Sequence, residues 1–168
     1  MIDYCGIWLL LTVMPQIVII PWGFENCSEH YRLGTHLVYG FTSALSLGIL
    51  LYPALVWRKP GTAKHRLGAL ALQFVARTCI YTVRAILPCS NKEALKYYGI
   101  MELLSVLGGV VNASRSPERW FDNGQLDLGL NSHQVMHLSA ALAIVVMYLG
   151  TQVDFDQHLQ ALQVSVIP

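Results

Sequence analysis

The sequence predicts an all-α fold, an integral membrane bundle of five transmembrane helices, and two observations carry this prediction. Of the 168 residues, 54% are apolar and only 12% are charged, with a mean hydropathy of +0.46, whereas a soluble domain carries about 25% charged residues. The apolar residues also fall in long blocks rather than in an amphipathic stripe. Disordered chains and coiled coils are excluded. A net charge of +1 gives no broad attraction for phosphate, so no nucleic-acid partner is expected.

Five blocks are long enough to cross a bilayer, because about 30 Å of hydrocarbon and a rise of 1.5 Å per residue require roughly 20 apolar residues. They cover 4–20, 33–57, 67–87, 97–113 and 132–150. A transmembrane domain over 1–150 is therefore expected, followed by a short non-cytoplasmic tail over 151–168.

The first block has an acid and no base before it and no small-residue cleavage site after it, so it is not a signal peptide. The second block contains Pro53, which a transmembrane helix tolerates. Its small residues Gly40, Ala44 and Gly48 recur every fourth position and predict a face on which a neighbouring helix packs closely.

The third and fourth blocks carry buried charge. Arg84 lies at nearly the same depth as Glu102 of the fourth block, and an ion pair between them is favoured because a buried unpaired charge costs several kcal/mol. Arg77 has no acid at its depth near the bilayer centre. We therefore expect Arg77 to face a cavity and to hold the head group of an anionic or polar lipid.

The fifth block opens with His133 and His137, which lie on one helical face at a spacing that lets both imidazoles reach a single metal ion. The alternative is an interfacial pair bonded to the preceding connection or to water, with Ser132 as the helix N-cap. Asp3 enters the first block at about the depth of His133, where a carboxylate could orient a metal-bound water. A solvated acid near the chain terminus is the alternative for Asp3.

The connections set the orientation. The connections after the second and fourth blocks hold six basic residues against three in the others, and the positive-inside rule places the richer side and the N-terminus in the cytoplasm. The six are Arg58, Lys59, Lys64, Arg66, Arg115 and Arg119, and the three are Arg32, Lys92 and Lys96.

Two of the four cysteines, Cys27 and Cys89, then share the non-cytoplasmic face. In an oxidising compartment such a pair favours a disulfide, with two unlinked thiols as the alternative. The glycosylation sequon that starts at Asn26 has Cys27 as its middle residue, so a disulfide there would compete with glycosylation.

The connection before the fifth block and the block's start contain a motif made up of Asn112, Arg115, Pro117, Glu118, Arg119, Trp120, Asp127, Asn131, Ser132, His133, Gln134, Met136 and His137. This motif resembles the signature of the progestin and adipoQ receptor family, which is related to haemolysin III proteins, and the similarity is greatest to its member-four branch. Asp3-Tyr4-Cys5-Gly6-Ile7 resembles the opening of the family's third helix.

The resemblance implies a seven-helix fold, of which this chain would be helices three to seven. It also implies zinc held by three histidines, two of which match His133 and His137, while Asp3 matches the acid that holds the zinc-bound water. The third histidine belongs to helix two and is absent from this sequence, so the site is expected to be incomplete and zinc weak or lost.

The implied function is a receptor or regulator of lipid signalling in the plasma membrane or Golgi. Its implied chemistry is ceramide amide hydrolysis by a zinc-dependent membrane amidohydrolase. Ceramide or fatty acid, together with membrane proteins, are the implied partners. The alternative is a truncated, non-catalytic membrane protein that acts through helix contacts or trafficking.

Overall fold

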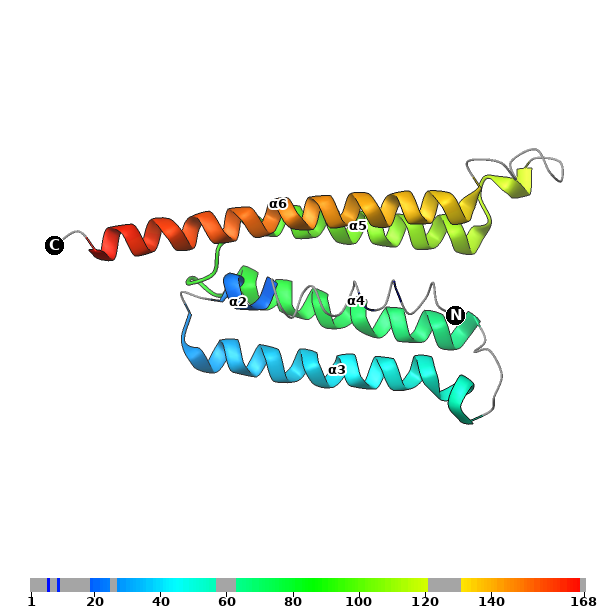
Figure 1. Ribbon diagram of the computed structural model, residues 1–168, viewed down its shortest axis with the longest axis horizontal. Helices are drawn as coiled ribbons and strands as arrows, with labels where there is room; N and C mark the ends of the chain where they lie inside the picture. The colour runs from blue at the N-terminus through cyan, green and yellow to red at the C-terminus, as the bar shows by residue number, and fades with distance from the viewer. Residues whose placement is uncertain are drawn as a thin grey trace. The chain divides into compact units, whose positions relative to one another are not determined.

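The computed structural model (Figure 1) describes Gly6, Leu9 and residues 19–24, 27–56, 63–120 and 131–166, and among these residues it contains helices and no strand. This confirms the predicted all-α class. The helices are α2 (Ile20–Gly23), α3 (Glu29–Val56), α4 (Ala63–Ile86), α5 (Glu93–Ser114), the 3₁₀ turn η2 (Glu118–Trp120) and α6 (Ser132–Val166).

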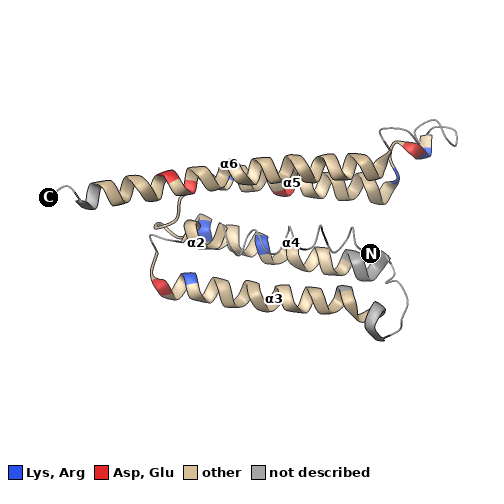
Figure 2. Ribbon diagram, viewed as in Figure 1, with Lys and Arg blue, Asp and Glu red and all other residues tan. Residues whose placement is uncertain are grey.

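Four of the five predicted spans coincide with α3 to α6, and the first, 4–20, lies largely outside the described residues. Within the described part, Gly68–Ile86, Glu93–Trp120 and Ser132–Gln163 are long and apolar enough to cross a membrane. Long stretches of these helices carry no charged side chain (Figure 2). The chain is therefore an integral membrane helix bundle.

Helix α6 continues well past Gly150, where the last span was expected to end, and reaches Val166. Gly150 lies inside the helix at a close approach to α5: a Cβ there would lie 2.9 Å from Tyr97 Cβ and 3.0 Å from Tyr98 Cε1. Most of the stretch expected as a tail is therefore a helical extension.

The chain divides into two compact units, one formed by residues 1–92 with 154–168 and the other by 93–153. In the first unit, α3 and α4 run side by side (Figure 1) and are joined by polar contacts. Ser46 Oγ donates to Ala69 O at 3.2 Å, and Gln73 Nε2 donates to Thr42 O at 3.2 Å. Interhelical bonds of this kind hold membrane helices together where lipid supplies no hydrophobic drive.

The small-residue face predicted for α3 is not the face that contacts α4, and its packing against another helix stays a prediction. Ala44 and Gly48 are exposed, and a Cβ added to Gly48 would meet nothing within 4 Å. The packing face carries Thr42 and Ser46 instead, because their polar groups find partners on α4.

A small apolar core in the first unit surrounds α2. Ile20 and Phe24 are buried with Tyr39 of α3 and Ile80 of α4, and Cys27 packs against this cluster. The core fixes α2 on the α3–α4 pair.

In the second unit α5 and α6 lie side by side (Figure 1), and a glycine of each helix approaches the other helix closely. A Cβ on Gly108 would lie 2.9 Å from Ser139 Cβ, which matches the close approach at Gly150. Small residues at a helix interface allow such contact in membranes.

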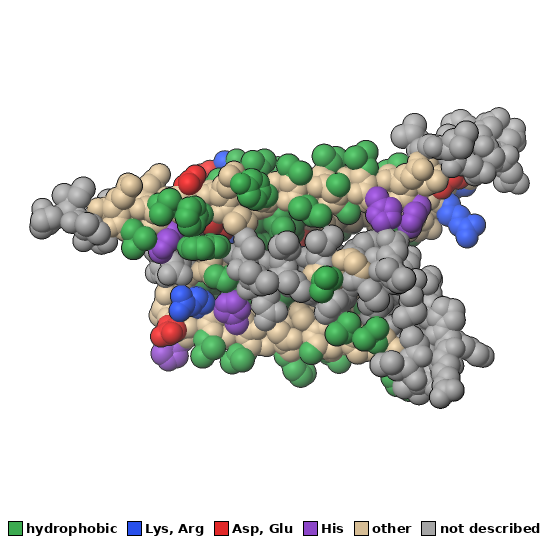
Figure 3. Space-filling model, viewed as in Figure 1, with side chains coloured by type: hydrophobic (Ala, Val, Ile, Leu, Met, Phe, Trp, Pro, Cys, Tyr) green, Lys and Arg blue, Asp and Glu red, His purple; other side chains and the backbone are tan. Residues whose placement is uncertain are grey.

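Apolar side chains are spread over the helices on the face that Figure 3 shows. This is the surface that hydrocarbon solvates, and it accounts for the many exposed large apolar residues. Those most exposed on α3, α5 and α6 include Phe41, Leu37, Val38, Leu103, Val110, Leu138 and Tyr148.

Candidate functional site

The most chemically specific feature is the histidine pair at the start of α6. His133 Nε2 and His137 Nε2 lie 3.2 Å apart, with ring centroids at 4.6 Å and ring planes at 85°. Two imidazoles on one tetrahedral zinc ion, each about 2.0–2.1 Å from it, place their nitrogens about 3.3 Å apart. The pair thus fits two positions of a zinc site, and the same separation fits a hydrogen bond between neutral imidazoles.

Both histidine side chains are exposed. The buried residues of this turn are Ser132 and Met136. His133 and His137 each follow one of these residues in the sequence, so their side chains point about 100° away from the buried face. Across the described ranges, no group of three or more His, Cys, Asp or Glu residues could hold a metal ion. Asp3 lies outside the described residues.

The first turn of α6 is capped by two side chains. Asn131 Oδ1 accepts a hydrogen bond from Gln134 N at 2.9 Å, so Asn131 is the N-cap and the alternative that gave this role to Ser132 was wrong. Ser132 is the first helical residue. Its N and its Oγ both donate to Glu118 Oε1, at 2.7 and 2.8 Å.

Glu118 belongs to the turn that carries the sequence motif. Arg115 has a left-handed backbone, with φ of 49°, and the Ser116–Pro117 peptide bond is cis. Arg119 N donates to Arg115 O at 3.0 Å, which closes the turn.

The outer side of this turn is exposed. Arg119 lies 4.7 Å over the ring of Trp120, a cation–π contact. Trp120 is 66% exposed, as expected for a side chain at a membrane interface. Asp127, the remaining acidic residue of the motif, lies outside the described residues.

Arg77 is buried in α4, with 2% of its surface exposed. One turn earlier lies Gln73, which is fully buried and whose Oε1 has no hydrogen-bond partner within the described part of the chain. The third predicted span therefore has a polar inner stripe, as ionisable residues in membrane helices require. The lipid-binding role of Arg77 stays a prediction.

Comparison with known proteins decides the family. A family model described as "Haemolysin-III related" matches residues 1–148. The chain belongs to the haemolysin-III-related family. This confirms the resemblance drawn from the motif around Arg115–Trp120 and His133.

Curated relatives of this haemolysin-III-related chain include progestin and adipoQ receptors. It is 34% identical to progestin and adipoQ receptor family member 4 of Mus musculus and 33% identical to that of Homo sapiens, each over 156 residues that cover 91% of this chain and 53% of the relative. It is 30% identical to the adiponectin receptor protein of Drosophila melanogaster, over 89% of this chain and 33% of that protein. The chain thus spans about half the length of the member-four relatives. No solved structure matches it.

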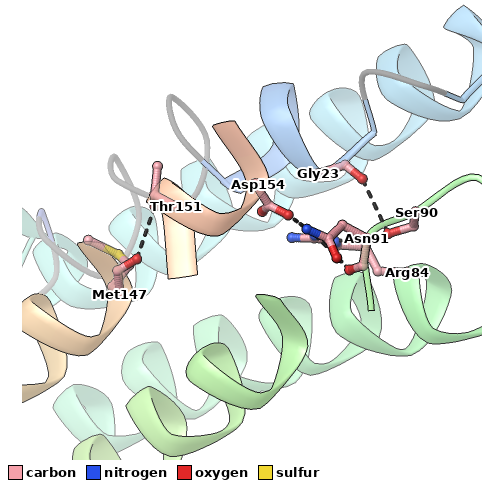
Figure 4. A network of polar contacts seen from close by, with 7 residues as sticks. All are labelled: Gly23, Arg84, Ser90, Asn91, Met147, Thr151 and Asp154. Carbon is pink, nitrogen blue, oxygen red and sulfur yellow. Dashed lines mark hydrogen bonds and ion pairs between the residues drawn. The ribbon is translucent and has the colours of Figure 1, made fainter. Parts of the chain in front are cut away.

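The haemolysin-III-related chain also contains a buried ion pair that sequence reasoning missed (Figure 4). Arg84 Nη2 donates to Asp154 Oδ1 at 2.7 Å, and both side chains are fully buried. Arg84 Nε donates to Ser90 Oγ at 3.1 Å, and Nη2 donates to Asn91 O at 3.2 Å. Ser90 Oγ in turn donates to Gly23 O at 3.2 Å.

Asp154 was missed because it lies beyond the expected end of the last span. The sequence spacing could have indicated it, since Asp154 follows Gly150 by one helical turn and therefore lies on the same face of α6. Glu102, the acid that the sequence suggested for Arg84, belongs to the other compact unit. The Arg84–Glu102 pair therefore stays a prediction.

A disulfide lies next to this ion pair. Cys27 and Cys89 are bonded, with their Cα atoms 5.2 Å apart, and this is the pair that the sequence suggested. Cys89 directly precedes Ser90, so a covalent bond and the Arg84 contacts hold the same loop.

Proposed function

We propose that this chain is a multi-pass membrane receptor or regulator of lipid signalling with a partial zinc site at His133 and His137. The observation that carries the proposal is the convergence of the two Nε2 atoms at 3.2 Å on α6. The names of the relatives, progestin and adipoQ receptor and adiponectin receptor, support the receptor part. Plasma membrane or Golgi is the proposed location.

The proposed ligand is a membrane lipid of the ceramide or fatty-acid class. Arg77 is buried in α4 one turn after the buried Gln73, and ionisable residues inside membrane helices commonly mark substrate pathways. A polar or anionic lipid head group is the task that we assign to it, with Gln73 as a neighbouring hydrogen-bonding group.

The proposed chemistry of a complete form is hydrolysis of the ceramide amide. His133 and His137 would hold zinc, which when bound supplies Lewis-acid activation of water and of the amide carbonyl. Asp3 is proposed to accept a proton from the water. A catalytic zinc normally has three protein ligands, so a complete site needs one ligand beyond this pair.

The test measures bound zinc and ceramide hydrolysis on the purified chain in detergent. Because only two ligands are present, we expect weakly bound zinc in the wild type, detected at equilibrium with added zinc, and its loss from His133→Ala and His137→Ala. An exposed histidine on α3, His30, provides the matched control, and His30→Ala should retain the metal. Equal zinc content in all four proteins would contradict the proposal.

A second function is favoured by the exposure of both imidazoles and by the lack of a three-ligand cluster in the described residues. In this alternative the chain is a non-catalytic membrane protein that acts through helix contacts or trafficking. It predicts that a variant lacking both histidines matches the wild type in lipid binding and in cellular location. A difference in lipid binding between the two proteins would exclude it.

A further inference from the structure

In the described part of the chain, the side chain of Glu118 reaches the start of α6 from outside the helix and binds its first residue, Ser132. Its Oε1 accepts two hydrogen bonds from Ser132, from N at 2.7 Å and from Oγ at 2.8 Å. The first backbone N–H groups of a helix have no partner inside the helix, and a carboxylate at that end is also favoured by the helix dipole. Glu118 therefore stabilises the start of α6 in two ways.

The chain directs Glu118 to this place through an unusual turn. Arg115 adopts a left-handed backbone that non-glycine residues rarely occupy. The turn is held by hydrogen bonds from Ser116 N to Val111 O at 3.1 Å and from Arg119 N to Arg115 O at 3.0 Å. An unfavourable backbone that its surroundings maintain is typical of functional sites.

His133 lies between the two residues that the caps restrain. Ser132 before it is bound by Glu118, and Gln134 after it is bound by Asn131 Oδ1 at 2.9 Å. His137 lies one turn further into α6, next to the place where Ser139 contacts Gly108 of α5. The position of His133 thus depends on the caps, whereas that of His137 is supported by helix packing.

We infer that Glu118 is a positioning residue that holds His133 at chelating distance from His137 through its two hydrogen bonds to Ser132. This inference rests on the proposed function, since it concerns the same histidine pair. The inference gives Glu118 an indirect role, because its two hydrogen bonds go to Ser132 and not to the histidines.

Glu118→Gln is the conservative variant. Its amide oxygen keeps the acceptor for Ser132, and its amide nitrogen replaces Oε2, which is buried and has no hydrogen-bond partner in the described part of the chain. Glu118→Ala removes the acceptor, and Ser132→Ala removes only one of the two bonds. Glu93→Ala is the matched control, because Glu93 is an exposed glutamate of α5 that binds Lys96.

The experiment titrates the full chain in detergent with Cu²⁺, which binds imidazole sites more tightly than Zn²⁺ and so reports on a two-histidine chelate. Amide hydrogen exchange of residues 132–135 is measured in parallel. We expect Glu118→Ala to weaken Cu²⁺ binding about tenfold and to speed exchange about tenfold, since hydrogen bonds to charged groups are among the stronger ones. Glu118→Gln should recover most of both, Ser132→Ala should show a smaller loss, and Glu93→Ala should match the wild type.

A double-mutant cycle separates positioning from general destabilisation. In a His133→Ala background there is no chelate left to position, so adding Glu118→Ala should leave Cu²⁺ affinity unchanged. An equal loss in both backgrounds would overturn the inference. Cu²⁺ affinity and hydrogen exchange of Glu118→Ala equal to those of the wild type would also overturn it. If Glu118→Ala fails to fold, unchanged Cu²⁺ affinity in Ser132→Ala overturns it instead.

The outcomes also distinguish this inference from the proposed function. A wild type that binds Cu²⁺ through His133 and His137 but binds no Zn²⁺ contradicts the proposed function and leaves the role of Glu118 supported. Zn²⁺ binding that needs both histidines but is unaffected in Glu118→Ala contradicts the role of Glu118 alone. Cu²⁺ binding that ignores both histidines contradicts both.

Discussion

The Arg84 region and the histidine pair use polar side chains in opposite ways. Arg84 and Asp154 are fully buried and 2.7 Å apart, and the Cys27–Cys89 disulfide lies beside them. His133 and His137 are exposed, and their rings contact each other within one helix.

This contrast separates a structural site from a chemical one. Opposite charges that are buried together as a hydrogen-bonded pair resist separation, and removing one partner leaves the other uncompensated. Exposed nitrogens that converge on one point remain accessible to a metal ion or a ligand. We therefore expect mutations at Arg84 or Asp154 to change stability and mutations at the histidines to change binding.

The largest expected effect follows loss of the buried acid. Asp154→Ala should destabilise the chain by about 3–5 kcal/mol, because it leaves the Arg84 charge buried without its carboxylate. Thermal unfolding in detergent measures the change. The exposed Glu93–Lys96 pair is the control, and Lys96→Ala should have no measurable effect.

Replacing both members of the Arg84–Asp154 pair tests whether the unpaired charge causes the loss of stability. Arg84→Met with Asp154→Leu removes both charges and should recover most of the stability, since apolar replacement of a whole buried pair is often neutral. A double variant as unstable as Asp154→Ala would show that the hydrogen bonds of Arg84 to the Ser90 loop carry the stability instead.

The disulfide should contribute the next largest effect. The Cys27–Cys89 bond closes a loop with a sequence separation of 62 residues, and removing such a bond typically costs about 2–4 kcal/mol. Cys27→Ser with Cys89→Ser should therefore lower the unfolding temperature. Cys79→Ser, at a free cysteine, is the control. Equal unfolding temperatures for the two proteins would mean that the Arg84 network holds the loop alone.

A smaller effect is expected at the α5–α6 contact in the unit that carries the histidines. Gly108→Ala places a Cβ 2.9 Å from Ser139 Cβ and should cost about 1–3 kcal/mol as an overpacked contact. The neighbouring Gly109 has nothing within 4 Å of such a Cβ, so Gly109→Ala should leave stability unchanged or raise it. Identical unfolding curves would show that α5 and α6 are not in close contact there.

Much of the fold follows from the sequence because membrane helices are set by simple quantities. Apolar block length predicted helices at α3, α4, α5 and α6, and the start of α6 at Ser132 agrees with the predicted boundary. The four-residue spacing of His133 and His137 predicted a shared face, and the 3.2 Å contact between their nitrogens shows it.

The remaining features depend on contacts between distant residues, which block length and spacing do not encode. Asn131 rather than Ser132 caps α6, since Asn131 Oδ1 accepts from Gln134 N, while Ser132 is the first helical residue and donates to Glu118, 14 residues earlier. Gly150 lies within α6, where two tyrosines of α5, Tyr97 and Tyr98, approach it closely. Asp154 is the acid at Arg84 because α6 continues far enough to bring it there.

X-ray absorption spectroscopy of the zinc-loaded chain tests the central claim, that His133 and His137 together hold a metal ion. We predict a first shell containing two imidazole nitrogens at about 2.0–2.1 Å, reduced to one in either single His→Ala variant and retained in His30→Ala. A zinc spectrum that is the same in the wild type and in the variant lacking both histidines would contradict the account.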